Sequence, residues 1–144
     1  MINYINFIIL TAISSGLIYV IYSDIRFRLI KNNAVLYILF FSICKGWIAN
    51  SNILVLIPLL ILVIGIFLNC FGVVGAGDIK LITALSLGMS EIEILRTIFF
   101  MGLSGVPLTI ACIVYFRFFK KGEKVTIPYG VAISTGYWFA HFLP

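Results

Sequence analysis

Long apolar stretches alternate with short polar ones along the whole chain. A membrane-spanning helix needs about 20 mostly apolar residues, and at that length the pattern predicts six helices. The expected segments cover about 4–22, 33–49, 53–71, 79–89, 94–116 and 125–143. We therefore predict an all-α, polytopic membrane protein with six transmembrane helices, forming a single domain over residues 1–144.

The fourth segment is too short to cross a bilayer by itself. Its apolar part, 79–89, would reach only about 16 Å at the α-helical rise, against a hydrocarbon core of about 30 Å. The span is complete only if the glycine-rich stretch 72–78 is included. Irregular backbone at that depth is tolerated only where it is buried in protein or lines a wet cavity. We therefore expect Gly75-Ala-Gly77-Asp78 to open the fourth helix beside such a cavity.

Composition supports the membrane class. Of 144 residues, 62% are hydrophobic and 10% are charged, and the mean hydropathy is +1.19. A soluble domain of this size could not bury so much apolar surface, because small proteins leave much of their surface exposed. The net charge of +5 indicates basic loops and no nucleic-acid partner. The three cysteines lie in or beside apolar runs and are expected to form neither disulfides nor metal sites.

The basic residues predict the orientation. With the N-terminus outside, the outer side holds only Lys45 and Arg96, and the cytoplasmic side holds the other eight. Those eight are Arg26, Arg28, Lys31, Lys80, Arg117, Lys120, Lys121 and Lys124. Excess Lys and Arg mark cytoplasmic loops, so this orientation is favoured. It places both aspartates of the chain at the cytoplasmic face of the plasma membrane.

Asp24 and Asp78 are the only aspartates in the sequence. An acid at the edge of a bilayer is costly and is a functional-site hypothesis by default. Two carboxyl groups held close together cannot easily both ionise, so one can activate a water while the other donates a proton to a carbonyl. This chemistry needs no metal and no cofactor. The alternative is a pair of structural acids that form ion pairs with Arg26 and Lys80.

Glycines beside Asp78 have a physical use. Without side chains, Gly75 and Gly77 let an extended substrate approach closely, and they can adopt unusual backbone angles. Lys80 could tune Asp78, orient the substrate, or only anchor its segment at the interface.

The positions of these residues resemble a known family. Tyr22-Ser-Asp24 after the first segment, together with Gly75-Ala-Gly-Asp-Ile-Lys80, resembles the GxGD membrane aspartyl proteases. More narrowly, the pair resembles the type IV prepilin leader peptidases. The second motif of that family is G-x-G-D-x-K, which is matched in full. After its first aspartate the family has Ile-Pro-Asn, where this chain has Ile30-Lys31-Asn32.

The resemblance implies that Asp24 and Asp78 are the catalytic pair of an aspartic endopeptidase. It extends to the number of helices and to Pro128-Tyr-Gly130 before the last one. It favours the compact branch of the family, which lacks the cytoplasmic cysteine-cluster domain. The implied partner is a prepilin or pilin-like protein with a single hydrophobic helix, cut at its short leader on the cytoplasmic side.

Two other functions remain open from the sequence. Gly102-Leu-Ser104-Gly105 matches the G-x-S-G of rhomboid serine proteases, with His141 as a possible base. Catalysis by that pair needs the two side chains within hydrogen-bond reach. A small carrier or channel could instead use Asp24 and Asp78 as a proton or cation site.

Overall fold

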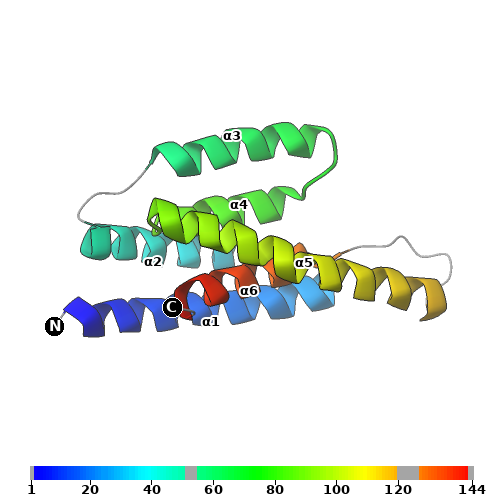
Figure 1. Cartoon of the computed structure of the whole chain (residues 1–144), viewed down its shortest axis with the longest axis horizontal. Helices are drawn as coiled ribbons and strands as arrows, with labels where there is room; N and C mark the ends of the chain where they lie inside the picture. Colours follow the sequence, from blue (N-terminus) through cyan, green and yellow to red (C-terminus); the bar gives the residue numbers. More distant parts are fainter. Residues whose placement is uncertain (1, 51–54, 120–126, 143–144) are drawn as a thin grey trace.

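The computed structural model describes residues 2–50, 55–119 and 127–142. Over these ranges the chain is all-α, with six helices and no strand (Figure 1). The helices are α1 (Ile2–Phe27), α2 (Asn32–Asn50), α3 (Leu56–Cys70), α4 (Ala76–Ser86), α5 (Glu91–Phe119) and α6 (Tyr129–Phe142). The number of helices and their order agree with the apolar pattern.

Helix α1 is longer than its apolar stretch. The pattern predicts an end near residue 22, whereas the helix continues to Phe27. Asp24 therefore lies in the last turn of α1, and not in the loop that follows. Residues 23–27 contain no glycine or proline that would break a helix. The helix ends where Arg28 takes a φ of 54°, the left-handed conformation that commonly follows a last helical residue.

Helix α4 is the short fourth helix that the sequence predicts, with 11 residues. It begins at Ala76, three residues before the expected apolar start, so Asp78 lies in its first turn. Helix α6 begins at Tyr129, directly after Pro128, although the pattern predicts a start near residue 125. The expected starts of α3 (residue 53) and α6 (residue 125) lie outside the described residues.

The shortest helix lies in the middle of the bundle. Helix α4 packs against α2, α3 and α6, while α1 packs on α2 and α6, and α5 packs along α6. Helix α3 lies at one edge, with α4 between it and the rest (Figure 1). The core is formed by apolar residues of α1, α2, α4, α5 and α6, among them Ile13, Leu17, Val20, Ile38, Leu81, Leu85, Ile94, Ile133 and Tyr137.

The backbones of α5 and α6 come very close together at Gly136. A Cβ at this position would lie 2.8 Å from the Met101 nitrogen and 2.9 Å from the Thr97 carbonyl oxygen. Small residues allow such close approach between helices in membranes. The close packing makes α5 the main support of α6.

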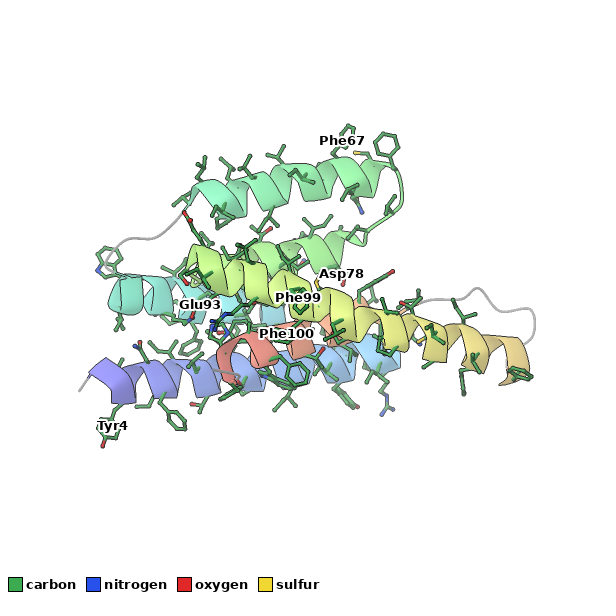
Figure 2. The ribbon with its side chains drawn as sticks, in the orientation of Figure 1. Tyr4, Phe67, Asp78, Glu93, Phe99 and Phe100 are labelled. Atoms are coloured by element: carbon green, nitrogen blue, oxygen red, sulfur yellow. The ribbon has the colours of Figure 1, made fainter. Side chains whose placement is uncertain are left out.

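The outside of the bundle is apolar. Two helical stretches, Tyr4–Phe27 and Glu91–Tyr115, are long and apolar enough to cross a bilayer, and only 6% of the second is buried. Large apolar side chains such as Tyr4 and Phe67 point away from the bundle (Figure 2). Soluble proteins rarely expose apolar patches of more than a few hundred Å². The exposed apolar side chains and the two long apolar helices agree with the membrane character that the sequence predicts.

Candidate active site

Asp24 is buried, and its carboxylate is held by the beginning of α6. Its exposed fraction is 6%, and the Gly130 N–H donates to its Oδ2 at 2.7 Å. The N-terminus of a helix carries unpaired N–H groups and a partial positive charge, so the beginning of α6 offsets part of the cost of burying a charged Asp24. No sequence pattern signals this contact between residues 24 and 130, although Pro128-Tyr-Gly130 marks the place.

Asp78 folds back on the start of its own helix. It is half-buried in the first turn of α4, three residues after Gly75, the capping residue of that helix. An acid at this position occupies the acidic place of a capping box. A Cβ at residue 75 would lie 2.8 Å from the Asp78 Oδ2. Glycine at this position therefore gives the carboxylate room.

The two sequence motifs lie against each other. A Cβ at Gly77 would lie 3.1 Å from the Cβ of Ile30, and the Lys80 Nζ donates to the Asn32 Oδ1 at 3.3 Å. Both partners belong to the stretch that follows Asp24. The contacts bring Asp24 close enough to act electrostatically on Asp78. The structure thus places Gly77 and Lys80 against the stretch that follows Asp24, and Gly75 against Asp78.

One of the two uses that the sequence predicts for these glycines, unusual backbone angles, is not found. Gly75 has a φ of −69° and a ψ of 138°, an extended conformation that any residue adopts. Among the described glycines, only Gly72 has a positive φ, of 70°. Unusual backbone angles are therefore not the reason for Gly75 and Gly77. Both are instead sites of close approach, to Asp78 and to Ile30.

A large apolar cavity opens beside Asp78. It has a volume of about 500 Å³ and lies between α3, α4, α5 and α6. Its walls include Ile64, Leu68, Ile98 and Ile133, and Asp78 is the only charged residue among the described ones that line it. Tyr129 also lines the cavity and directly precedes the residue that holds Asp24. The cavity therefore reaches Asp78 and the beginning of α6.

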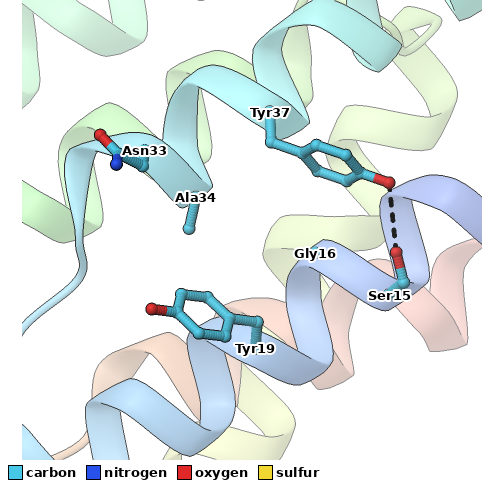
Figure 3. A pocket seen from close by; sticks show the side chains of 6 residues that line it. All are labelled: Ser15, Gly16, Tyr19, Asn33, Ala34 and Tyr37. Carbon is cyan, nitrogen blue, oxygen red and sulfur yellow. Dashed lines mark hydrogen bonds between the residues drawn. The ribbon is translucent and has the colours of Figure 1, made fainter.

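A second hollow, between α1 and α2, has another character. It is lined by Tyr19, Asn33 and Tyr37, and the Ser15 and Tyr37 hydroxyls lie 3.4 Å apart (Figure 3). No acid or base is among its described lining residues. It carries no chemistry of its own for catalysis.

The interpretation of the aspartates as structural ion pairs is wrong for both suggested partners. Arg26 donates to the Tyr22 hydroxyl at 3.0 Å, and Lys80 donates to Asn32. In the described part of the chain, neither forms an ion pair with an aspartate. Nor do three His, Cys, Asp or Glu side chains come together there as a metal site would need.

The Ser104 and His141 pair does not form. The Ser104 hydroxyl accepts from the Thr135 hydroxyl at 3.0 Å, while His141 contacts Lys45 and Glu93. Since Thr135 and His141 both lie on α6, the two sites are separated by about 9 Å of helical rise. Ser104 faces the middle of α6 and has no base beside it, so the serine-protease alternative is wrong.

The comparisons with known proteins agree with the motifs. A model of the type IV leader peptidase family matches residues 11–120. This stretch contains both aspartates and the G-x-G-D-x-K motif, and it ends before α6. No curated protein and no solved structure matches the chain. The family model covers well over half of the sequence, and the chain belongs to the type IV leader peptidase family.

Proposed function

We propose that this protein is a membrane aspartic endopeptidase that removes the short leader of prepilin or pilin-like proteins. The observation that carries the proposal is the contact between the two motifs. Gly77 packs on Ile30 and Lys80 binds Asn32, so the turn that contains Asp78 lies beside the end of α1 that contains Asp24. Without this contact, the aspartates would be two separate polar residues on different helices.

The proposed chemistry uses the two carboxyl groups as a unit. Carboxyl groups held close together share one proton and titrate as a pair. The Gly130 N–H at the start of α6 donates to the Asp24 carboxylate, and we assign Asp24 as the group that takes a proton from the attacking water. Asp78 then holds the shared proton and donates it to the carbonyl oxygen of the scissile bond. Gly75 leaves room for the Asp78 carboxylate, and Gly77 lets the turn that contains Asp78 pack against Ile30.

The membrane arrangement we propose has six spanning helices in a single domain. The N-terminus lies outside, because this orientation puts eight basic residues on the cytoplasmic side and two on the outer side. Helix α4 spans only about 16 Å of rise, and the glycine-rich stretch 72–75 before it completes the crossing. Asp24 and Asp78 then lie near the cytoplasmic face of the plasma membrane, where a leader on that side can reach them.

The apolar cavity between α3 and α5 is where we propose that the hydrophobic helix of the substrate binds. It is lined by apolar side chains, and Asp78 is its one described charged residue. A substrate that enters from the bilayer would leave its leader, which is the polar part, beside the aspartates. Single-helix substrates of the prepilin kind have this construction.

A cleavage assay in cells tests the function. Wild type, Asp24→Asn, Asp78→Asn and Ser104→Ala are each expressed with a candidate prepilin, and the loss of the leader is followed by mass. We expect cleavage by wild type and by Ser104→Ala, and none by either aspartate variant. If neither wild type nor any variant cleaves a prepilin, proton and cation flux is measured in liposomes. A flux that needs both Asp24 and Asp78 would replace the peptidase with the carrier alternative.

A further inference from the structure

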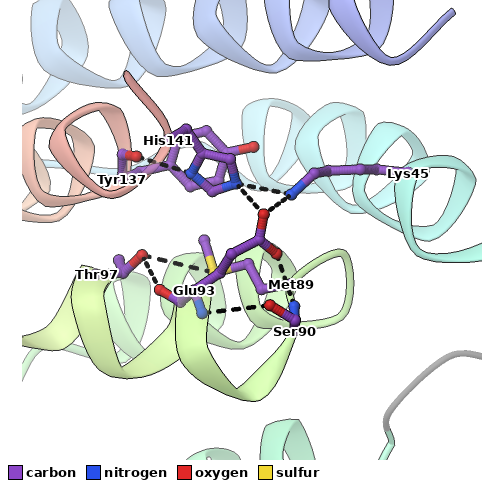
Figure 4. Close-up of polar contacts among 7 residues, drawn as sticks. All are labelled: Lys45, Met89, Ser90, Glu93, Thr97, Tyr137 and His141. Carbon is purple, nitrogen blue, oxygen red and sulfur yellow. Dashed lines mark hydrogen bonds and ion pairs between the residues drawn. The ribbon is translucent and has the colours of Figure 1, made fainter. Parts of the chain in front are cut away.

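Three ionisable side chains that the proposed mechanism does not use meet near the end of α6 (Figure 4). The Lys45 Nζ, from α2, donates to the Glu93 Oε1 of α5 at 3.0 Å and to the His141 Nε2 of α6 at 2.7 Å. The Lys45 and His141 side chains are only 6% and 4% exposed. We call Lys45, Glu93 and His141 the α6 anchor, because they join the last turn of α6 to two other helices.

Further contacts fix the orientation of each member. The Glu93 Oε2 accepts the Ser90 N–H at 2.7 Å, and the Ser90 hydroxyl accepts the Glu93 N–H at 3.4 Å, which together form a capping box at the start of α5. The His141 Nδ1 lies 2.9 Å from the Tyr137 carbonyl oxygen, so Nδ1 donates there and Nε2 accepts from Lys45. The imidazole also stacks on the Tyr137 ring, with centroids 4.2 Å apart.

Burying charged side chains such as these costs desolvation free energy, so the cluster calls for a functional reason. Buried ion pairs add little stability over apolar packing of the same shape, and their best-attested use is to specify one arrangement. Charged groups within membrane proteins also tend to mark function. Helices α5 and α6 already pack closely at Gly136, so the anchor is not needed to join them. What it adds is a directional contact that fixes how α6 is placed along and around its own axis.

The opposite end of α6 carries the groups that hold Asp24. Helix α6 has 14 residues, and the rise from Gly130 to His141 is about 17 Å. A short helix without internal proline moves as a rod, so a shift at His141 is transmitted to Gly130. Because the Gly130 N–H meets Asp24 at 2.7 Å, a small rotation of α6 would separate them.

We propose that the α6 anchor positions the start of α6 and, through the Gly130 N–H, the Asp24 carboxylate. The proposal rests on the proposed function for its effect on catalysis. Lys45, Glu93 and His141 are positioning residues, because their described contacts include neither aspartate. Asp78 and Glu93 lie well apart along the bundle (Figure 2).

The first test separates positioning from stability. The variants are Glu93→Gln, Lys45→Met and the double variant Lys45→Met/Glu93→Gln, with the exposed Glu91→Gln in the same first turn of α5 as control. Thermal midpoint, kcat and KM for a prepilin are measured on the purified proteins. Glu93→Gln leaves Lys45 buried without a counter-charge, so we expect its thermal midpoint to fall below that of wild type. The double variant removes both charges, so we expect its thermal midpoint to return to the wild-type value.

In the double variant we still expect kcat to be about 10- to 100-fold below wild type, with KM unchanged. Misplacing a catalytic group by about 1 Å costs about 100-fold, and the substrate cavity does not involve the anchor. Glu91→Gln keeps the wild-type kcat. If the double variant regains both the midpoint and the wild-type kcat, the anchor only stabilises the fold and the proposal is wrong.

The second test needs no substrate. Nitroxide labels replace the exposed Tyr22 of α1 and Tyr129 of α6, in a chain whose native cysteines are replaced by alanine, and pulsed electron resonance gives their distance. We expect one narrow distribution for the parent and a shifted or broader one for Lys45→Met/Glu93→Gln. An unchanged distribution overturns the positioning role. If unlabelled wild type cleaves no prepilin, the proposed function fails. The distance between the two labels still decides whether the α6 anchor positions α6.

Discussion

The contact between Gly130 and Asp24 makes Gly130→Ala the most informative single substitution. The Gly130 N–H donates to the Asp24 Oδ2 at 2.7 Å. A Cβ on residue 130 would lie 2.8 Å from that same oxygen and 3.2 Å from the Val20 Cγ1. Since the carbon and oxygen cannot remain that close, the added methyl group pushes the carboxylate away from the start of α6.

The size of the effect follows from the overlap. Carbon–oxygen contacts are comfortable at about 3.3 Å, so the carboxylate must recede by about half an ångström. Catalytic groups need to be held to within about 0.5 Å, and an error of about 1 Å costs about 100-fold. We therefore expect kcat to fall about 10- to 100-fold, or about 1.4 to 2.7 kcal/mol in the activation free energy.

The assay uses purified enzyme and a prepilin, with the released leader followed by mass. Gly102→Ala is the matched control, because a Cβ at Gly102 would meet nothing within 4 Å. Alanine is a better helix former than glycine by about 1 kcal/mol, so the loss of rate should come without a large loss of thermal stability. If Gly130→Ala is folded and retains the wild-type kcat, the beginning of α6 does not position Asp24.

Three further predictions concern the surroundings of the site. Gly77→Val places methyl groups against Ile30, whose Cγ1 and Cδ1 would be 3.6 and 3.7 Å from the new Cβ. We expect cleavage to be lost and to be partly restored by adding Ile30→Ala, which removes these two carbons, and no restoration would contradict the packing argument. Asn32→Ala removes the partner of Lys80, which is exposed; we expect an effect of about 1 kcal/mol or less on kcat/KM, and a complete loss would give Lys80 and Asn32 a larger role. Ser90→Ala removes the hydroxyl from the capping box of α5; we expect about 1 kcal/mol less stability in a denaturation series, and no change would mean that this cap contributes nothing.

The helices and the place of the site could be predicted because they depend on local sequence. Apolar runs give the six helices, and the shortness of the fourth follows from counting residues between Asp78 and the next polar stretch. The end of α1 was not predictable from hydropathy, because a helix continues through polar residues until something stops it. Here it stops at Arg28, six residues beyond the apolar run.

The partners of the site residues could not be predicted in the same way. The Gly130 N–H is a backbone group, which every residue except proline carries, so its contact with Asp24 leaves no composition signal. The α6 anchor takes one residue from each of three helices, and Lys45, Glu93 and His141 form no motif. A signal for the start of α5 did exist, since Ser90-x-x-Glu93 is a capping-box sequence.

The most direct test of the account measures initial rates of leader cleavage by purified wild type, Asp24→Asn, Asp78→Asn and the double variant. The account predicts that each single variant is folded and loses at least about 1,000-fold in kcat, and that the double variant is no worse than either, because groups that act as one unit are not additive. A folded single variant that cleaves the prepilin at close to the wild-type rate would contradict the aspartate pair.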